Sequence, residues 1–498
     1  MRDRVALAVA AFAGILHLAT ANRYDVFRDE LYFIVCGRHP AFGYADQPPL
    51  VPLVAAGLYG LGAQTWLLRL PAVLAAAGLG ALAVAFVRLL GGRNGAAWIA
   101  GIAAVTAPVL MGLTATFNTT ACEPLCWTAV AYLLARGVMR DDGRALVWAG
   151  VVAGLTMEAK YALPLWLVAL AVGLLACPER RVFARRELWI GAALAAVIAI
   201  PSVLWQAAHG FPFVELVRNA HLKDEPVTPL AFALNQVLVM NPLYAPLWVL
   251  GLGAPFAVRE LRAARFLSIA FAFCAVVIIA QHGKDYYLAP AYPPLLAIGA
   301  VAIERLIRSA AVRAVYLGFA VALSAVIAPL ALPILSPDRL IAYERAIHLT
   351  ANAQERADVG SVLPPTYADM LGWHDFVREV GTAFDRLAPL ERSRTAILVD
   401  NYGEAAALDI YGAPYRLPPA LAGHNQYFYW ALRGQHPVDL VRITDDPGEL
   451  RKYCASVSVL AVTNARYARS FENGKAIALC LGLHPPLETL WPQQKLLI

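Results

Sequence analysis

Long apolar runs alternate with short charged connectors from Val5 to Pro333, and this alternation limits the folds open to the chain. Hydrophobic residues make up 59% of the sequence, charged residues only 15%, and the mean hydropathy is +0.57. A soluble globular chain would hardly reach these values. The pattern is typical of a polytopic α-helical membrane protein, whose helices each cross roughly 30 Å of hydrocarbon.

We predict about eleven transmembrane helices from the lengths of these runs. They lie near Val5–Ala21, Trp66–Leu90, Ala96–Leu113, Ala121–Ala135, Ala145–Met157, Tyr161–Ala176, Leu188–Ala208, Leu230–Val258, Phe266–Ala280, Tyr287–Ile303 and Val312–Leu335. The first run reads as a retained helix rather than a cleaved signal, because no small-residue cleavage site ends it and further spans follow.

Basic residues gather in every second connector, which predicts the orientation of the chain. These connectors carry Arg2 and Arg4, Arg88 and Arg93, Arg136 to Arg144, Arg180 to Arg186, Arg259 to Arg265, and Arg305 to Arg313. By the positive-inside rule this side is cytoplasmic. We therefore expect a multi-pass protein of the cytoplasmic membrane, with its N-terminus inside and its tail outside.

After Pro333 the apolar runs shorten and charges spread evenly, which predicts a domain boundary. We expect a transmembrane domain over residues 1–335 and an extracytoplasmic α/β domain over residues 336–498. The tail has strand signals at Thr395–Asp400, Val438–Asp445 and Ser456–Asn464, and helix signals at Trp373–Leu387 and within Asn401–Gly412. It has no GxGxxG or P-loop motif for a nucleotide.

Two further features of the tail bear on function. Cys454 and Cys480 could form a disulfide if the tail is extracytoplasmic. Asp400, Asn401 and Glu404 end the first predicted strand, where open α/β sheets tend to bind ligands.

The first connector that follows a span on the outer side, Asn22 to Leu50, is unusually rich in charge. It holds Asp25, Asp29, Glu30 and Asp46 among Arg23, Arg28 and Arg38. Ionisable residues at a membrane face are expensive to bury and are candidates for function, although Asp29 could equally cap a short helix. Pro48 and Pro49 hold the chain after Asp46 extended. Two apolar stretches here, Glu30–Gly37 and Pro49–Gly62, are too short to span and are expected to lie flat at the membrane interface.

Two later outer stretches add charged candidates. Glu123 stands at the outer end of a span just before Pro124, where it could also serve only as a cap. Lys284 precedes Tyr286 and Tyr287 between two spans, and such a group could bind a phosphate or form an interfacial belt. Lys160 and Arg218 also lie at outer span ends or loops.

The order of these motifs resembles a known family. DELY, DQPPL, an acidic residue in xEPL and KxxYxLxPxYPPL resemble the bacterial branch of the dolichyl-phosphate-mannose-protein mannosyltransferase superfamily, which are GT-C membrane glycosyltransferases and include the lipid A aminoarabinose transferase. The similarity covers roughly Arg4 to Pro333. Within the tail, NYGEAAALDIYG and GHNQYFYW look like bacterial members of the same family.

The resemblance implies an inverting transfer from a polyprenyl-phosphate sugar to an extracytoplasmic glycan, lipid or protein acceptor. Asp29 matches the aspartate taken as catalytic, and Asp46 matches the acid before the proline pair. Gln47 stands where the aminoarabinose transferase has Lys, so either that phosphate contact comes from elsewhere or the donor differs. Glu123 matches the second-loop acid, and Lys284 and Tyr287 match the late motif near the donor phosphate.

Sugar transfer from a polyprenyl phosphate needs a base for the acceptor, cations for the phosphate and a surface for the acceptor sugar. A carboxylate would take the acceptor proton; the catalytic candidates are Asp29, Glu30, Asp46 and Glu123. Cations would stabilise the departing phosphate; the candidates are Arg28, Lys160, Arg218 and Lys284, with Tyr287. Aromatic and amide side chains of the tail could contact the acceptor sugar, or pack as a strand; they are His424, Asn425, Tyr427 and Trp430. We expect the carboxylates and cations to meet at one outer surface.

The sequence also leaves a metal site and two other classes of function open. Asp46 and His221 could hold a divalent metal, although no ligand spacing requires one. Membrane lipids are expected partners, and nucleic acid is not. A transporter or lipid flippase is the alternative function, since Glu158 and Lys160 lie close to a span, but that class places charge near the bilayer midplane. A membrane scaffold with a binding tail would leave the acidic loop unexplained.

Overall fold

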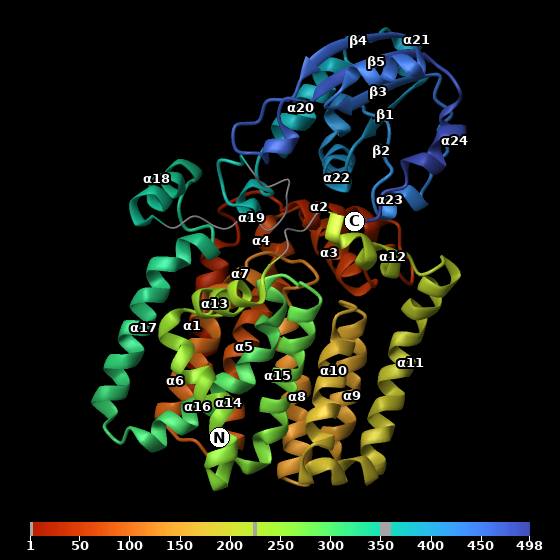
Figure 1. The fold of residues 1–498 in the computed structure, drawn as a ribbon. Coiled ribbons are helices and arrows are strands. Elements are labelled where there is room, and N and C mark those ends of the chain that lie inside the picture. The colour runs from red at the N-terminus through yellow and green to blue at the C-terminus, as the bar shows by residue number, and fades with distance from the viewer. Residues whose placement is uncertain (1–2, 223–226, 349–359) are drawn as a thin grey trace. The chain divides into compact units, whose positions relative to one another are not determined.

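A computed structural model describes residues 3–222, 227–348 and 360–498 of the chain (Figure 1). The chain divides into two compact units. Unit 1 comprises residues 1–23, 63–203 and 226–334, and unit 2 comprises residues 24–62, 204–225 and 335–498. The first charged loop therefore folds in the same unit as the tail.

Unit 1 is made of helices, with short 3-10 segments (η) at several bends. Its elements are α1 (Arg4–Thr20), α4 (Thr65–Leu68), α5 (Leu70–Leu89), α6 (Asn94–Thr106), α7 (Pro108–Leu113), α8 (Glu123–Met139), α9 (Gly143–Met157), α10 (Leu163–Leu175), η1 (Pro178–Ala184), α11 (Arg186–Ala208, which runs on into unit 2), α13 (Pro229–Val239), η3 (Pro242–Tyr244), α14 (Ala245–Ala257), η4 (Arg259–Ala264), α15 (Arg265–Ala280), η5 (Asp285–Ala291), α16 (Tyr292–Leu306) and α17 (Ala310–Ala331).

The long apolar helices confirm the membrane class. Five helices in the described residues are long and apolar enough to cross a membrane, or seven if two sharply bent pairs each count as one span. Shorter apolar helices, among them α1, α6 and α9, add to these. The count of about eleven spans stays a prediction.

The predicted continuous span Leu230–Val258 is wrong. The chain bends by 93° between α13 and the segment Pro242–Ala257. Asn241 has a positive φ of 73°, and Pro242 has no N–H to continue a helix. The Asn241 amide donates to the carbonyl oxygen of Ala320 and to the hydroxyl of Ser324, so the break is satisfied internally.

Small residues let the central helices of unit 1 approach closely. A Cβ on Gly299 of α16 would meet the carbonyl oxygen of Leu247 at 1.8 Å, and one on Gly251 of α14 would meet that of Leu295 at 2.3 Å. Close approach at small residues is typical of helix packing in membranes, where packing rather than hydrophobicity drives association. Every residue of α16 from Tyr292 to Ile303 is buried, which makes it the core helix of unit 1.

Unit 2 combines two helices of the first loop, a helix that follows α11, and the α/β tail. Its helices are α2 (Arg28–Arg38), α3 (Leu50–Gly60), α12 (Pro212–Asn219), η2 (Ala220–Leu222), α18 (Pro337–Ile347), α19 (Pro365–Ala368), α20 (Trp373–Phe384), α21 (Pro389–Arg392), α22 (Tyr402–Tyr411), η7 (Ala413–Tyr415), α23 (Gln426–Tyr429), η8 (Pro447–Lys452), η9 (Ser470–Glu472), α24 (Leu487–Leu490) and η10 (Trp491–Gln494).

The tail strands form one mixed sheet in the order β2-β1-β3-β5-β4 (Figure 1). They are β1 (Thr395–Val399), β2 (Leu421–Ala422), β3 (Asp439–Thr444), β4 (Cys454–Val462) and β5 (Ala476–Leu483). β1 pairs in parallel with β2 and β3, while β5 pairs antiparallel with β3 and β4. The three predicted strands and the two predicted tail helices, α20 and α22, are confirmed, and the structure adds β2 and β5.

The two short helices predicted in the first loop exist as α2 and α3, but only α3 suits an interfacial position. α3 leaves Leu50 and Leu53 exposed. The apolar side chains of α2 from Leu31 to Cys36 are buried. A Cβ on Gly37 would meet the carbonyl oxygen of Pro52 at 2.0 Å, so α2 packs tightly on α3. α2 is thus a core helix of unit 2, not a helix that presents an apolar face to lipid.

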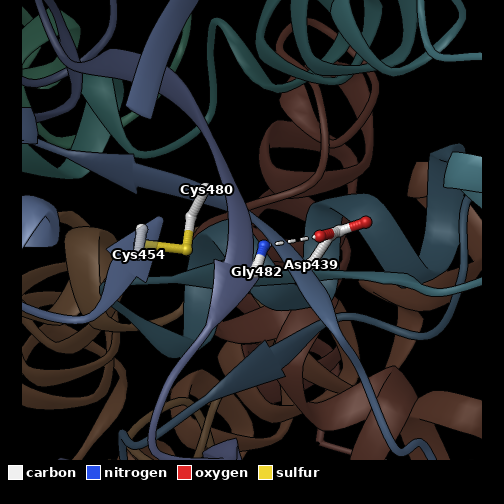
Figure 2. The surroundings of a disulfide bond; sticks show 4 residues. All are labelled: Asp439, Cys454, Cys480 and Gly482. Carbon is white, nitrogen blue, oxygen red and sulfur yellow. Dashed lines mark hydrogen bonds between the residues drawn. A yellow bond between two sulfur atoms is a disulfide. The ribbon is translucent and has the colours of Figure 1, made fainter. Parts of the chain in front are cut away.

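A disulfide joins Cys454 of β4 to Cys480 of β5, with the two Cα atoms 5.4 Å apart (Figure 2). Nearby, the backbone N–H of Gly482 donates to the buried Asp439 carboxylate at 2.8 Å. The bond covalently fixes the edge strand β4, whose outer side has no strand partner in the sheet.

Loss of this disulfide should destabilise the tail. Because a cross-link restricts the unfolded chain, the Cys454→Ser/Cys480→Ser variant should unfold with a free energy lower by roughly 2–4 kcal/mol. Thermal unfolding of purified protein with and without reductant measures this. The wild type should lose stability on reduction and the variant should not; two alkylatable thiols at these positions in untreated wild type would contradict the bond.

Glu472 lies buried in the tail among other ionisable groups. Burial raises the pKa of Glu472 to about 8, as do the neighbouring carboxylates Asp369 and Glu404, although Arg28 and Arg469 oppose the rise. The unfolded chain releases this proton near the ordinary pKa of 4.5. The contribution of Glu472 to stability is therefore present below pH 4.5 and is lost as pH rises through about 8.

Glu472→Gln should remove this part of the pH dependence, because the amide cannot ionise. We expect the melting temperatures of wild type and variant to converge at pH 5 and to separate toward pH 8, with the variant the more stable. Parallel melting curves across this range would contradict the assignment.

Candidate active site

Asp29 lies in the first turn of α2, where the positive end of the helix favours a carboxylate. The hydroxyl of Tyr402, the first residue of α22, donates to Asp29 Oδ1 at 2.8 Å. The two residues are 373 positions apart in the chain. The tail therefore holds one oxygen of the carboxylate that the sequence pointed to as catalytic.

Asp46 is held in the same way by a tyrosine and an amide. The Tyr32 hydroxyl donates to Asp46 Oδ1 at 2.8 Å, and Asn425 Nδ2 donates to Asp46 Oδ2 at 3.3 Å. Tyr32 itself accepts the backbone N–H of Gln426 at 3.0 Å. Since the rings of Tyr32 and Tyr402 lie 4.7 Å apart, two adjacent tyrosines tie Asp29 and Asp46 into one cluster.

Glu30, unlike Asp29, bonds the backbone of its own helix start. Glu30 is fully buried, and its Oε2 accepts the backbone N–H of Phe27 at 2.8 Å. This contact satisfies one of the free donors at the start of α2, as the acidic partner of a capping box does. The cap that we considered for Asp29 is thus supplied by Glu30, which favours a structural role for Glu30.

Arg28 is fixed by contacts to the tail. Its guanidinium lies 5.2 Å from the centre of the Tyr402 ring, and its Nε lies 3.6 Å from Asp369 Oδ1. A Cβ on Gly403 would come within 2.4 Å of Arg28 Cγ, so only glycine fits beside this side chain. Burial raises the pKa of Asp369, against the opposing effect of Arg28 and Arg469.

Two other residues of unit 2, Arg218 and Gln47, differ in their exposure to solvent. Arg218 lies exposed in the last turn of α12. Gln47, which replaces the lysine of the family motif, is buried and its amide donates to Cys36 Sγ at 3.8 Å. Gln47 therefore does not supply the phosphate contact that a lysine would.

The candidates of unit 1 form a separate set. Lys160 Nζ donates to Glu123 Oε2 at 2.7 Å, which pairs a predicted phosphate ligand with a predicted catalytic acid. Glu158 accepts the Ser202 hydroxyl at 2.7 Å. Glu123 belongs to unit 1, whereas Asp29 and Asp46 belong to unit 2. The expectation that these three carboxylates meet at one surface therefore stays a prediction.

The late motif begins at the start of η5. Tyr287 is 39% exposed and packs edge-on against Tyr286, with ring centres 4.8 Å apart. Lys284 is partly buried just before them, and Asp285 accepts the Asn235 amide at 2.8 Å. Lys284 and Tyr287 are thus accessible enough to contact a ligand.

The predicted acceptor-binding run His424–Trp430 mostly turns inward. It forms the short helix α23 rather than a strand, and His424, Asn425 and Tyr427 are all buried. The Tyr427 hydroxyl donates to Asp409 at 2.9 Å. Only Trp430 among the four is partly exposed, so it alone offers a ring on which a sugar could stack.

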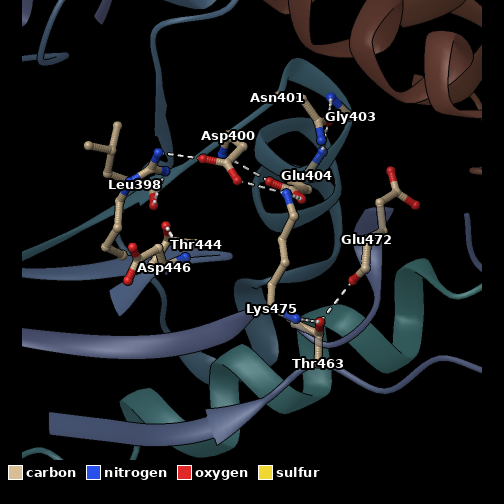
Figure 3. A network of polar contacts seen from close by, with 11 residues as sticks. Leu398, Asp400, Asn401, Gly403, Glu404, Thr444, Asp446, Thr463, Glu472 and Lys475 are labelled. Atoms are coloured by element: carbon tan, nitrogen blue, oxygen red, sulfur yellow. Dashed lines mark hydrogen bonds and ion pairs between the residues drawn. The ribbon is translucent and has the colours of Figure 1, made fainter. Parts of the chain in front are cut away.

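The charged residues at the end of β1 form ion pairs and hydrogen bonds with residues of the tail (Figure 3). Lys475 Nζ lies 2.8 Å from Asp400 Oδ2 and 2.9 Å from Glu404 Oε1, and Arg442 also pairs with Asp400. Burial alone would raise the pKa of Asp400, but Arg442 and Lys475 hold it below its usual range. Asn401 caps α22 by accepting the N–H groups of Gly403 and Glu404. These contacts favour a structural role for the strand end, and ligand binding there stays a prediction.

Among the described residues, no group of three or more His, Cys, Asp and Glu side chains could hold a metal ion. Asp46 is directed to Tyr32 and Asn425, and the side chain of His221 lies outside the described part of the chain.

Sequence reasoning missed Tyr32, Tyr402 and Asp369 as site residues. Both tyrosines stand in motifs that the sequence drew attention to, DELY and NYGEAAALDIYG. The signal was a polar aromatic beside each acidic motif, but the partner of each hydroxyl depends on the tertiary fold.

Comparisons with known proteins agree with this architecture. Residues 46–205 match the family model described as dolichyl-phosphate-mannose-protein mannosyltransferase. The lipid A galacturonosyltransferase RgtD of Rhizobium johnstonii is 29% identical over 239 residues, which cover 45% of this chain and 49% of RgtD. The chain therefore matches about half the length of this curated relative.

Two solved structures extend the similarity to nearly the whole fold. ArnT from Cupriavidus metallidurans bound to undecaprenyl phosphate aligns with a TM-score of 0.60 at 14% identity, over 95% of this chain and 97% of ArnT. The apo state of ArnT aligns over the same shares with a TM-score of 0.61 at 15% identity. The chain thus has the GT-C membrane fold, and the resemblance to bacterial glycosyltransferases of the dolichyl-phosphate-mannose-protein mannosyltransferase superfamily is confirmed.

Proposed function

We propose that this protein is an inverting glycosyltransferase that moves one sugar from a polyprenyl-phosphate donor to a lipid, glycan or protein acceptor. The observation that carries the proposal is the carboxylate of Asp29, held by Tyr402 and flanked by the cation of Arg28. The ArnT fold match, in a structure that contains undecaprenyl phosphate, supports the class of donor. RgtD, a lipid A galacturonosyltransferase, supports a sugar-transfer reaction.

Asp29 would act as the general base of this reaction. As the acceptor oxygen forms its bond to the anomeric carbon, its proton passes to the Asp29 carboxylate. The bond from that carbon to the phosphate oxygen breaks on the opposite face, and its electron pair leaves with the phosphate. One attack from the opposite face inverts the configuration. A polyprenyl phosphate is already a good leaving group, so this scheme needs no nucleotide.

Cations would stabilise the charge that develops on the departing phosphate. Arg28 is the candidate nearest in sequence to the base, and its contact with Asp369 fixes the guanidinium in direction. Lys160, Lys284, Tyr287 and Arg218 are further candidates. Lys160 would exchange its carboxylate partner Glu123 for a phosphate oxygen, since both are anionic acceptors.

The proposed location is the outer face of the cytoplasmic membrane. The basic connectors favour a cytoplasmic N-terminus and an extracytoplasmic tail. The disulfide between Cys454 and Cys480 supports the same orientation, because such bonds persist in oxidising compartments.

The broken span of unit 1 is a feature shared with transporters, whose binding sites lie at interrupted helices. Here the break at Asn241 is filled by hydrogen bonds to Ala320 and Ser324. Both partners are neutral groups of the protein itself, so we assign the break a structural role. The glycosyltransferase therefore remains our proposal.

Asp29→Asn should abolish most sugar transfer, because an amide cannot accept the proton. We expect kcat to fall by about 10²–10⁴-fold, the usual contribution of a general base. The assay supplies purified protein with a polyprenyl-phosphate sugar and a membrane extract, and follows labelled sugar into product.

Asp25→Asn is the matched control, since it makes the same change four positions away in the same loop. Asp25 pairs with the exposed side chain of His374 at 2.9 Å. The Asp25→Asn variant should transfer sugar at the wild-type rate. Equal activity of Asp29→Asn and wild type would refute the assignment of the base.

Lys160→Gln should weaken donor binding more than it slows transfer, because the amide carries no charge for the phosphate. We expect the donor KM to rise about tenfold, the scale of one charge-assisted hydrogen bond. Lys452→Gln, at an exposed lysine that pairs with Glu449 in the tail, serves as the control. An unchanged donor KM in a folded Lys160→Gln protein would remove Lys160 from the phosphate site.

A further inference from the structure

We propose that Tyr402 of the tail is a positioning residue for Asp29, and that the tail thereby completes the active site rather than only receiving the acceptor. This inference rests on the proposed function, since it gives Tyr402 a role through the base. The contacts that carry it all lie within unit 2, between the first loop and the tail.

The hydroxyl of Tyr402 is a donor to Asp29 over the working pH range. Its distance to Asp29 Oδ1 is 2.8 Å, an ordinary length for a hydrogen bond between a hydroxyl and a carboxylate oxygen. Burial raises the pKa of Tyr402 well above its usual range, with Asp29 adding to the rise and Arg28 opposing it. The phenol therefore keeps its proton and fixes one oxygen of Asp29, which directs the carboxylate.

The ring of Tyr402 is held on several sides. Arg28 lies over one face at 5.2 Å, the ring of Tyr32 lies 4.7 Å away, and His424 packs edge-on at 4.9 Å. A ring packed in this way has few alternative rotamers, and a base is effective only when its geometry is fixed.

The residues on both sides of Tyr402, among them Asn401, Gly403 and Glu404, belong to the polar network at the end of β1 (Figure 3). Asn401 accepts the N–H of Gly403 at 2.8 Å, which caps α22 at its first turn. Glu404 Oε2 accepts the N–H of Asp400 at 3.0 Å, while Glu404 Oε1 pairs with Lys475 at 2.9 Å. The ion pairs around Asp400 and Glu404 thus fix the start of α22, and the start of α22 fixes the backbone of Tyr402.

The test compares Tyr402→Phe with wild type in the donor and acceptor assay. Phenylalanine keeps the ring and its packing and removes one hydroxyl. We expect kcat to fall about tenfold or more, as for loss of a hydrogen bond to a charged group, with donor KM changed less than about twofold. The melting temperature should stay near that of wild type.

Tyr467→Phe is the matched control, because Tyr467 is another tail tyrosine whose hydroxyl bonds a carboxylate, that of Asp338. It should leave kcat unchanged. A double variant separates positioning from a general structural effect: added to Asp29→Asn, Tyr402→Phe should cause no further loss of the residual rate, because its effect passes through the missing carboxylate.

The outcomes distinguish this inference from the proposed function. If Asp29→Asn loses transfer while Tyr402→Phe behaves like Tyr467→Phe, the positioning role is overturned and the function stands. A Tyr402→Phe loss that multiplies with that of Asp29→Asn, or that only follows a fall in melting temperature, also overturns it. If Asp29→Asn transfers sugar like wild type, the assignment of the base fails and the positioning role fails with it. If wild type itself transfers no sugar from the polyprenyl-phosphate donor, the proposed function fails.

Discussion

A hydrogen bond from a neutral hydroxyl to a carboxylate, made twice, underlies the arrangement of the candidate site. Tyr402 donates to Asp29 and Tyr32 donates to Asp46, both at 2.8 Å. Each bond occupies one carboxylate oxygen and fixes the direction of the other, without the opposing charge that a lysine or arginine would bring. A neutral donor leaves the carboxylate able to accept a proton, which suits a general base better than an ion pair does.

The two carboxylates depend on distant parts of the chain for these bonds. The first loop supplies Asp29 and Asp46, and the tail supplies Tyr402 and Asn425. Arg28 joins the same contact through Asp369 and the Tyr402 ring. The tail is therefore part of the proposed active site, although it follows the last span in sequence. Its buried ion pairs do not contact Asp29; they stabilise the start of α22, which carries Tyr402.

Much of this architecture could be predicted from the sequence, because hydropathy identifies membrane helices and residue patterns identify strands. The apolar runs identified the membrane class, a short apolar run before a turn identified β1, and stretches rich in β-branched residues identified β3 and β4. The 93° bend at Asn241 was missed because a hydropathy pattern does not record one positive φ. β5 was missed because Ala476–Leu483 has no alternating pattern, being buried along most of its length. The partners of Asp29 were missed because a contact across 373 residues leaves no local signal.

A structure of the whole protein with a polyprenyl phosphate bound would test the role of Asp29. We expect the lipid phosphate beside α2, with Asp29 still bonded to Tyr402 and its other oxygen directed at the position from which an acceptor hydroxyl would attack. A lipid phosphate bound elsewhere in the protein, with Asp29 and Tyr402 facing neither it nor an acceptor path, would exclude Asp29 as the base.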